Sequence, residues 1–354
     1  MDALLKKVLQ HKASDLHMTQ GMPISLRVDG DILKIDNEIV DAQKMKKLID
    51  PIIPPANRRE FMESNDTDFA YEIKGVARFR VNLFRDINGV GAVFRAIPST
   101  IMPASQLGFP SAINVFCKAY KGLVLVTGPT GSGKSTTLAS MIDQINESRS
   151  QHIITIEDPV EFIHPQKKCL IRQRQIHGHT KSFAAALRAA LREDPDIVMI
   201  GEMRDLETIS IALETAETGH LVFGTLHTND AISTVNRIVD QFPSNQQDQI
   251  RVMLSDALVG IVAQTLLKKK GGGRIAAHEV LVVNQAVKNI IREGKTSMLQ
   301  NHMLTRKQDG NILLSESLIA LVTKGIVEPI RAVEKAIDKK EFVDLLAKMG
   351  IQVS

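Results

Sequence analysis

One short segment limits the fold of this chain more than any other feature of its sequence. An apolar run at 122–127 leads into Gly128-Pro-Thr-Gly-Ser-Gly-Lys-Ser135, and a helical pattern begins at Thr136. A G-x-x-x-x-G-K-[ST] loop between a strand and a helix surrounds nucleotide phosphates, because its glycines let backbone N–H groups converge and the helix N-terminus adds positive charge. We therefore predict a nucleoside-triphosphate site formed by Gly128, Pro129, Thr130, Gly131, Ser132, Gly133, Lys134, Ser135 and Thr136.

Hydrolysis needs further groups beside this loop. We expect Lys134 to bridge the β- and γ-phosphate oxygens and the Ser135 hydroxyl to ligate Mg²⁺. Glu202 follows the apolar run 196–200, where a carboxylate can orient and deprotonate the attacking water. Gly201 stands where an aspartate usually helps to hold Mg²⁺, so the metal depends on Ser135, the phosphates and water, with only an indirect contribution from Glu202. The alternative for Glu202 is a simple ion pair with a neighbouring arginine, Arg204.

Two more polar clusters lie at strand ends. Glu157 ends a run that begins at His152, and open α/β sheets bind their ligands at the carboxyl ends of strands. His227 stands at the end of the run that starts at Leu221, where it can hydrogen-bond a γ-phosphate. His220 stands at the entry to the same run, so it belongs either to the nucleotide site or merely to the C-terminal cap of the preceding helix.

The second part of the chain predicts a parallel sheet. Short β-rich apolar runs alternate with helical patterns, as expected for strands that are covered on both faces. The runs are 122–127, 152–156, 196–200 and 221–225, and the helical patterns are 136–146, 183–192 and 206–218. From Ser244 we predict helices only, with a Ser244/Gln247 capping box and one apolar face of Ile250, Leu254, Ala257 and Ile261. Glycines at 294, 310, 325 and 350 separate the short helices expected in the tail.

The first part of the chain reads as strands joined by tight turns. An Asp29-Gly30 turn and a Lys74-Gly75 turn each lie between apolar runs, which predicts two hairpins. Within 77–83 the period of two puts apolar residues on one face and Arg78 with Arg80 on the other. The sheet continues through 90–97, and Pro98, Pro103 and Pro110 mark a linker.

Composition and charge exclude several classes of protein. The net charge is only +4, and aromatic residues make up 4% of the chain, which gives little for binding nucleic acid. The two cysteines, Cys117 and Cys169, lack metal-site spacing, so we expect buried reduced thiols. Lys6 and Lys7 interrupt the apolar start, and no run of 18 apolar residues occurs, so we expect a cytoplasmic protein that is not inserted in a membrane.

Together these motifs resemble the secretion-type hexameric ATPases, and within them the members that retract type IV pili. The resemblance rests on the order of the motifs over nearly the whole chain. They are Ser14-Asp-Leu-His17, 128–136, Thr155-Ile-Glu-Asp-Pro159, 191–196 with Gly201-Glu-Met-Arg-Asp205, Ala216-Glu-Thr-Gly-His220 with 224–228, and the C-terminal stretch 286–295. Two stretches depart from the family pattern: Arg174-Gln-Ile-His-Gly-His179, and Val287-Lys288 in the C-terminal stretch.

The resemblance implies a fold, an assembly and roles for residues. The α/β fold would consist of a PAS-like N-terminal α+β domain (1–98), a linker (99–111), a RecA-like P-loop core with a parallel sheet (112–270) and a C-terminal helical region (271–354). Six copies would form a ring at the cytoplasmic face of the inner membrane, where it would bind the platform protein of the pilus machinery and use ATP and Mg²⁺ to power retraction and twitching motility. Its site residues would be Glu202 as catalytic glutamate, Glu157 as acidic-box carboxylate, His220 and His227 as histidine box, and Arg78, Arg80 and Arg95 reaching the phosphates.

Other readings of the chain remain open. A pilus-assembly or secretion ATPase usually carries a longer N-terminal domain and a four-cysteine zinc insertion. The two stretches that depart from the family pattern leave an accessory retraction motor open. A small-molecule kinase needs an acceptor pocket, and a DNA translocase needs a stronger basic balance. A nucleotide-gated scaffold without turnover has no use for a base at Glu202.

Overall fold

The computed structural model describes residues 1–28, 30–97 and 100–353, which fall into two compact units. The first unit is Met1–Thr100 and the second is Ile101–Ser354, so the division lies within the stretch for which a linker is predicted. Pro98 and Ser99 of that stretch lie outside the described residues. No helix in the described part of the chain is both long enough and apolar enough to span a bilayer.

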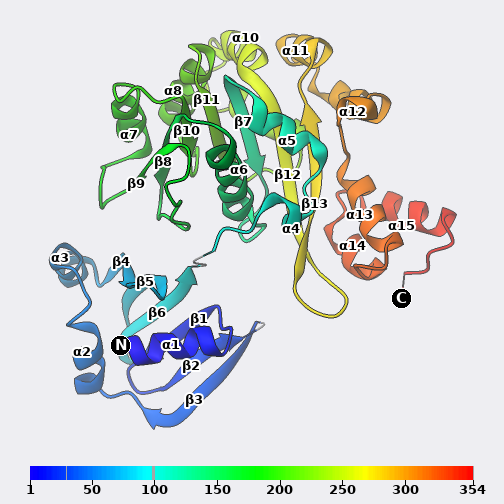
Figure 1. Cartoon of the computed structure of the whole chain (residues 1–354). Helices are drawn as coiled ribbons and strands as arrows, with labels where there is room; N and C mark the ends of the chain where they lie inside the picture. Colours follow the sequence, from blue (N-terminus) through cyan, green and yellow to red (C-terminus); the bar gives the residue numbers. More distant parts are fainter. Residues whose placement is uncertain (29, 98–99, 354) are drawn as a thin grey trace. The chain divides into compact units, whose positions relative to one another are not determined.

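The first unit is built on a six-stranded antiparallel sheet in the order β3-β2-β1-β6-β5-β4 (Figure 1). Its elements are α1 Asp2–Gln10, β1 Asp15–Thr19, β2 Pro23–Val28, β3 Asp31–Ile39, α2 Ala42–Ile49, α3 Pro55–Ser64, β4 Asp66–Ile73, β5 Ala77–Asp86 and β6 Gly89–Ile97. Both predicted hairpins are present, since β2 pairs with β3 and β4 with β5. Asp29 of the predicted Asp-Gly turn lies outside the described residues.

Strand β5 shows why this sheet has one covered face. Ala77, Phe79, Val81 and Leu83 are buried, as the period of two predicts. They belong to a core that also holds residues from α1, α2 and α3. Arg78 and Arg80 lie on the other face of β5, as predicted, and Arg80 lies opposite Arg95 of β6.

The second unit is built on a seven-stranded sheet in the order β13-β12-β7-β11-β10-β8-β9. Strands β7 to β12 run parallel to their neighbours, and β13 pairs antiparallel with β12. The elements as far as β12 are α4 Ala104–Leu107, α5 Ser111–Lys118, β7 Gly122–Thr127, α6 Lys134–Ser148, β8 His152–Glu157, β9 Leu170–Gln175, α7 Phe183–Ala190, β10 Ile197–Ile200, α8 Leu206–Glu217, β11 Leu221–Leu226, α9 Ala231–Val239, α10 Gln247–Ala257 and β12 Leu258–Lys268. The predicted parallel α/β sheet is confirmed.

Helices cover both faces of this sheet (Figure 1). Leu123 and Leu125 of β7 pack with residues of α7 to α10, whereas Val124 and Val126 pack with residues of α5 and α6. Every residue of β7 is buried, which explains why the strand is a continuous apolar run rather than an alternating one.

The prediction of helices only from Ser244 onward is wrong. Helix α10 ends at Ala257, and the chain then forms β12 and, over Arg274–Val282, β13. Ile261 therefore lies in a strand, because Leu258 to Leu267 is a nearly continuous apolar run that is buried on both faces of the sheet. The capping box is also absent, because Gln246 is the N-cap residue and the Gln247 amide donates to the Phe242 carbonyl.

The boundary predicted at 270 falls inside the β12–β13 hairpin, so it does not separate two domains. Helices do follow β13; glycines with positive φ at 294, 310 and 325 separate them as predicted, and Gly350 follows the last of them. They are α11 Gln285–Arg292, α12 Leu299–Thr305, α13 Leu314–Thr323, α14 Pro329–Lys335 and α15 Lys339–Lys348, with single 3₁₀ turns at Thr296–Met298 and Lys307–Asp309. Residues of α13, α14 and α15 form a cluster of their own with Leu267 and Ala277.

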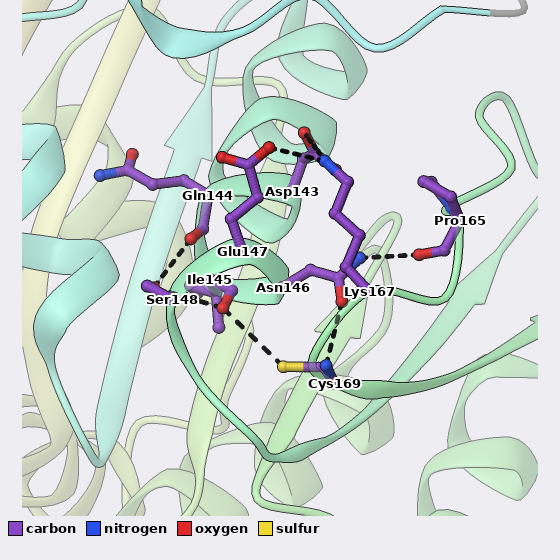
Figure 2. Close-up of polar contacts among 9 residues, drawn as sticks. All are labelled: Asp143, Gln144, Ile145, Asn146, Glu147, Ser148, Pro165, Lys167 and Cys169. Carbon is purple, nitrogen blue, oxygen red and sulfur yellow. Dashed lines mark hydrogen bonds and ion pairs between the residues drawn. The ribbon is translucent and has the colours of Figure 1, made fainter.

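The C-terminal end of α6 is tied to the loop before β9 (Figure 2). The Asn146 amide is fully buried; it donates to the Pro165 carbonyl at 2.7 Å and accepts from the Cys169 N–H at 3.1 Å. The Lys167 ammonium lies 2.8 Å from carboxylate oxygens of both Asp143 and Glu147. A buried amide that loses such partners costs about 1–3 kcal/mol, so this contact holds α6 and β9 together. Cys169, like Cys117, is buried with a free thiol, as predicted.

Candidate active site

The loop between β7 and α6 has the backbone that its glycines predict. Gly128, Gly131 and Gly133 have φ of +144°, +77° and +92°, a region that other residues rarely adopt. A Cβ atom at Gly128 would lie 2.3 Å from the carbonyl oxygen of Gln264, so no side chain fits there. The strand, the loop and the helix occur in the predicted order, which places backbone N–H groups at the N-terminus of α6.

Gln264 of β12 holds this loop in place, and sequence reasoning missed it. The side chain is buried; its amide donates to the Ser132 carbonyl at 2.7 Å and accepts from the Thr137 hydroxyl at 2.8 Å. It thereby joins the loop, α6 and β12. The signal in the sequence was a polar side chain within a mostly apolar run. It indicates a contact with the phosphate loop only when the run is known to form a strand beside β7.

Lys134 lies over the loop. Its ammonium donates to the carbonyls of Gly128 at 2.8 Å and Pro129 at 3.3 Å. Burial lowers the pKa of Lys134, while the negative charges of Glu202 and Glu161 act to raise it. Strands β7, β11, β10 and β8 are consecutive and parallel in the sheet, so the residues after β8 and β10 lie at the same edge as the loop after β7.

Glu202 is positioned by two cationic or protonatable partners. Its Oε1 atom accepts from the Arg204 guanidinium and lies 2.6 Å from Nε2 of His227. Burial acts to raise the pKa of Glu202, but the hydrogen bond and charge of Arg204, together with His227, lower it below 4.5 overall. The carboxylate is therefore ionised at neutral pH. The structure thus contains the ion pair of Glu202 with Arg204 and also a contact between Glu202 and His227, which follows the neighbouring strand β11.

An open pocket adjoins these side chains. Its lining comes from the segments that follow β10 and from the end of β11 and the residues beyond it, and comprises Glu202, Met203, Arg204, Leu226, His227, Thr228 and Arg237. His227 faces this pocket with a side chain that is 46% exposed. Such a pocket at the carboxyl ends of parallel strands is where open α/β sheets take their ligands.

Glu157 ends β8, the strand beside β10, and is buried. It accepts hydrogen bonds from the Thr155 hydroxyl at 2.7 Å and the Gln173 amide at 3.1 Å. Burial raises the pKa of Glu157 to about 7, although both hydrogen bonds act in the opposite direction. A Cβ atom at Gly201 would lie 3.2 Å from the Glu157 Cα atom, which gives a steric reason for glycine where an aspartate is usual.

His220 lies at the wrong end of the sheet for the loop of its own chain. Leu221 pairs with Gly122, whereas Thr127, which precedes the loop, pairs with Leu226. The 6 residues of β11, which extend over about 20 Å, therefore separate His220 from the level of the loop. Its Nδ1 atom instead lies 3.1 Å from the Thr215 carbonyl in the last turn of α8. Within one chain His220 contacts the last turn of α8, in line with the alternative as a helix cap, and its role at a nucleotide stays a prediction for the assembled ring.

The three predicted arginines lie on one sheet face of the first unit. Arg80 Nε is 3.3 Å from Asp68 Oδ1, and Arg95 Nε is 2.8 Å from Asp15 Oδ1. Arg78 and Arg80 alternate with buried residues of β5, so both side chains lie on the solvent-facing side of the strand. The ion pair of Arg80 with Asp68 lies on the exposed surface of the sheet.

The residues of this site fit a Mg²⁺ ion that takes most of its ligands from the nucleotide phosphates and water and few from the protein. Within 1–28, 30–97 and 100–353 no cluster of three or more His, Cys, Asp or Glu side chains has the geometry of a metal site. Ser135 stands in the first turn of α6, directly after Lys134, where its hydroxyl can supply one oxygen ligand. One hydroxyl with phosphate and water oxygens suits Mg²⁺, which keeps several waters when it binds.

Known proteins match the chain over nearly its whole length. Type IV pilus retraction ATPase PilT of Pseudomonas aeruginosa is 50% identical over 324 residues, which are 92% of this chain and 94% of that protein. A twitching motility protein of Neisseria gonorrhoeae is 48% identical over 312 residues, or 88% of this chain and 83% of that one. A crystal structure of the pilus retraction motor PilT with bound ADP matches with a TM-score of 0.89 at 46% identity, covering 96% of this chain and 97% of that one. Since the family described as type II/IV secretion system protein matches residues 1–335, the chain belongs to that family.

Proposed function

We propose that this protein hydrolyses ATP and uses the energy to retract type IV pili, the activity for which its relatives are named. The observation that carries the proposal is the position of Glu202. An ionised carboxylate just after β10, which contacts His227 and lines the pocket at the carboxyl ends of the strands, is the group that a hydrolase needs and a scaffold does not.

Each residue of the site has a task in this reaction. The backbone N–H groups of 130–136 bind the phosphates, and the Lys134 ammonium leaves its two carbonyls to bridge phosphate oxygens. Glu202 orients the attacking water and takes its proton, while His227 fixes the carboxylate. Bound Mg²⁺, held by the Ser135 hydroxyl, would neutralise charge on the phosphates. Glu157, which titrates near pH 7, is a second carboxylate able to polarise water beside Glu202.

The active assembly that we propose is a homohexamer on the cytoplasmic face of the inner membrane, bound to the pilus platform protein. In it, Arg78, Arg80 and Arg95 contact the phosphates of a nucleotide. Arginine suits that task because its planar guanidinium binds two oxygens at once and keeps its charge. His220, remote from the loop of its own chain, reaches a nucleotide only if another subunit supplies it.

A deletion strain tests the proposed function. Because a retraction motor removes pilins from the base of the pilus, cells without this protein are expected to carry many pili and to lose twitching. Electron microscopy and a twitching assay measure the two outcomes, and the wild-type gene restores both. Loss of pili in the deletion strain would instead identify an assembly motor.

Arg80→Ala is expected to lower kcat by roughly tenfold to 10³-fold while the dissociation constant for nucleotide changes little, because the guanidinium acts on charge that develops during phosphoryl transfer. Steady-state kinetics and fluorescent-nucleotide binding separate the two effects. Arg85→Ala is the matched control: this arginine is the last but one residue of the same strand and lies over the Phe61 ring. Light scattering checks that both variants keep a mass about six times that of the chain. Equal effects of the two variants on kcat would contradict the prediction and leave Arg80 with only its surface ion pair to Asp68.

A further inference from the structure

Glu279 is a buried acid that none of the predicted motifs contains. It lies in β13, where it pairs with Ala263 of β12, which in turn pairs with Thr127 of β7. Residues paired in this way share a height and a face of the sheet. Glu279 is therefore level with the last residue before the phosphate loop, on the face that α9 covers. Its side chain is buried, and burial raises the pKa of its carboxyl group to about 7.

The two carboxylate oxygens bind the starts of two helices. Oε1 accepts from the N–H of Ala231, the first residue of α9, at 2.8 Å. Oε2 accepts from the N–H of Leu314, the first residue of α13, at 3.4 Å. First-turn N–H groups have no partner inside their own helix, so one side chain here supplies a partner to each of two helices that are far apart in the sequence.

Helix α9 is in turn fastened to the catalytic edge. The Thr234 hydroxyl lies 2.6 Å from the Thr228 hydroxyl, 2.6 Å from the Asp230 carbonyl and 3.5 Å from the Thr127 hydroxyl. Thr228 directly follows His227, the residue that contacts Glu202. Helix α9 therefore fixes the C-terminal end of loop 227–230 through Thr234. Glu279 in turn holds the first residue of α9.

We propose that Glu279 is a positioning residue for hydrolysis: by holding the start of α9 it keeps His227 on Glu202. The proposal rests on the proposed ATPase activity. Glu279 itself touches neither phosphate nor water in this scheme, and its effect passes through α9 and the loop 227–230. A carboxylate is required because it offers acceptors in two directions, whereas an amide offers one and turns an NH₂ group toward the other N–H.

The test compares Glu279→Gln with Glu316→Gln in the full chain at pH 8. Glu316 is the matched control because its carboxylate accepts from the N–H of Leu313 and caps α13 without contacting α9. We expect Glu279→Gln to lower kcat at least tenfold with nucleotide affinity within threefold of wild type, and Glu316→Gln to leave both within threefold. An equal loss of kcat in the two variants would overturn the proposal, since a weakened α13 would then explain it.

A double-mutant cycle with His227→Ala provides the second readout. If Glu279 acts through His227, Glu279→Gln lowers kcat by less than threefold in the His227→Ala background, whereas a full additional tenfold loss contradicts the proposal. Thr234→Val, which keeps the shape of the side chain and removes its hydroxyl, is expected to reproduce the loss of kcat and serves if Glu279→Gln does not fold. Wild-type protein without turnover would refute the proposed function instead.

Discussion

Glu202→Gln is expected to bind nucleotide as tightly as the wild type and to lose ATP hydrolysis by roughly 10²- to 10⁴-fold, the usual contribution of a positioned general base. The amide has nearly the same shape and still accepts one hydrogen bond, so the contacts around His227 change little. It cannot take a proton from water. Single-turnover hydrolysis, followed together with fluorescent-nucleotide binding, measures the two effects separately.

Glu157→Gln is the informative comparison. Because burial raises the pKa of Glu157 to about 7, roughly half of this side chain is already neutral at neutral pH, and an amide resembles the protonated form. Its loss of turnover should be smaller than that of Glu202→Gln and should grow as the pH rises above 7, where the wild-type carboxyl is ionised. If Glu202→Gln keeps turnover within a few-fold of the wild type, Glu157 becomes the candidate base.

Lys134→Ala is expected to weaken nucleotide binding by roughly 10- to 150-fold, which corresponds to the loss of charged hydrogen bonds worth about 1.5–3 kcal/mol. The substitution removes the ammonium from the phosphates and leaves two loop carbonyls to water. Isothermal titration with a non-hydrolysable ATP analogue measures the change.

Lys121→Ala is the control for this charge. Lys121 is exposed and precedes β7, at the other end of the same strand. Its removal should leave affinity unchanged, and the thermal unfolding midpoint of both variants should stay close to that of the wild type. An equal loss of affinity in the two variants would show a general effect of charge rather than a contact of Lys134.

Local sequence was sufficient for features set by neighbouring residues. The loop from Gly128 to Ser135 and the alternation along β5 follow from glycine conformations and from a period of two, which are both local properties. The same reasoning failed at β12, because a short apolar run fits a buried helix as well as a buried strand. Only its pairing with β7, more than a hundred residues earlier in the chain, decides between them.

The site residues likewise fall into those that local sequence predicts and those that depend on contacts distant in sequence. The positions of Glu202 and Glu157 could be predicted because each lies at or just beyond the carboxyl end of an apolar strand. Gln264 and Glu279 could not, since each acts on a segment that is distant in sequence and looks in isolation like a polar interruption of a strand. The role of His220 at the nucleotide comes from the family resemblance, and within one chain β11 separates His220 and His227 to opposite ends of the sheet.

The bond from Gln264 to the Ser132 carbonyl spans 132 positions of sequence, and this has a consequence for protein synthesis. A ribosome that adds roughly 5 to 20 residues per second needs about 7 to 26 s to extend the chain from Ser132 to Gln264. During that interval the glycine-rich loop has emerged without the side chain that fastens it. A nascent chain therefore lacks the hydrogen bond from Gln264 to its phosphate loop until β12 has been synthesised.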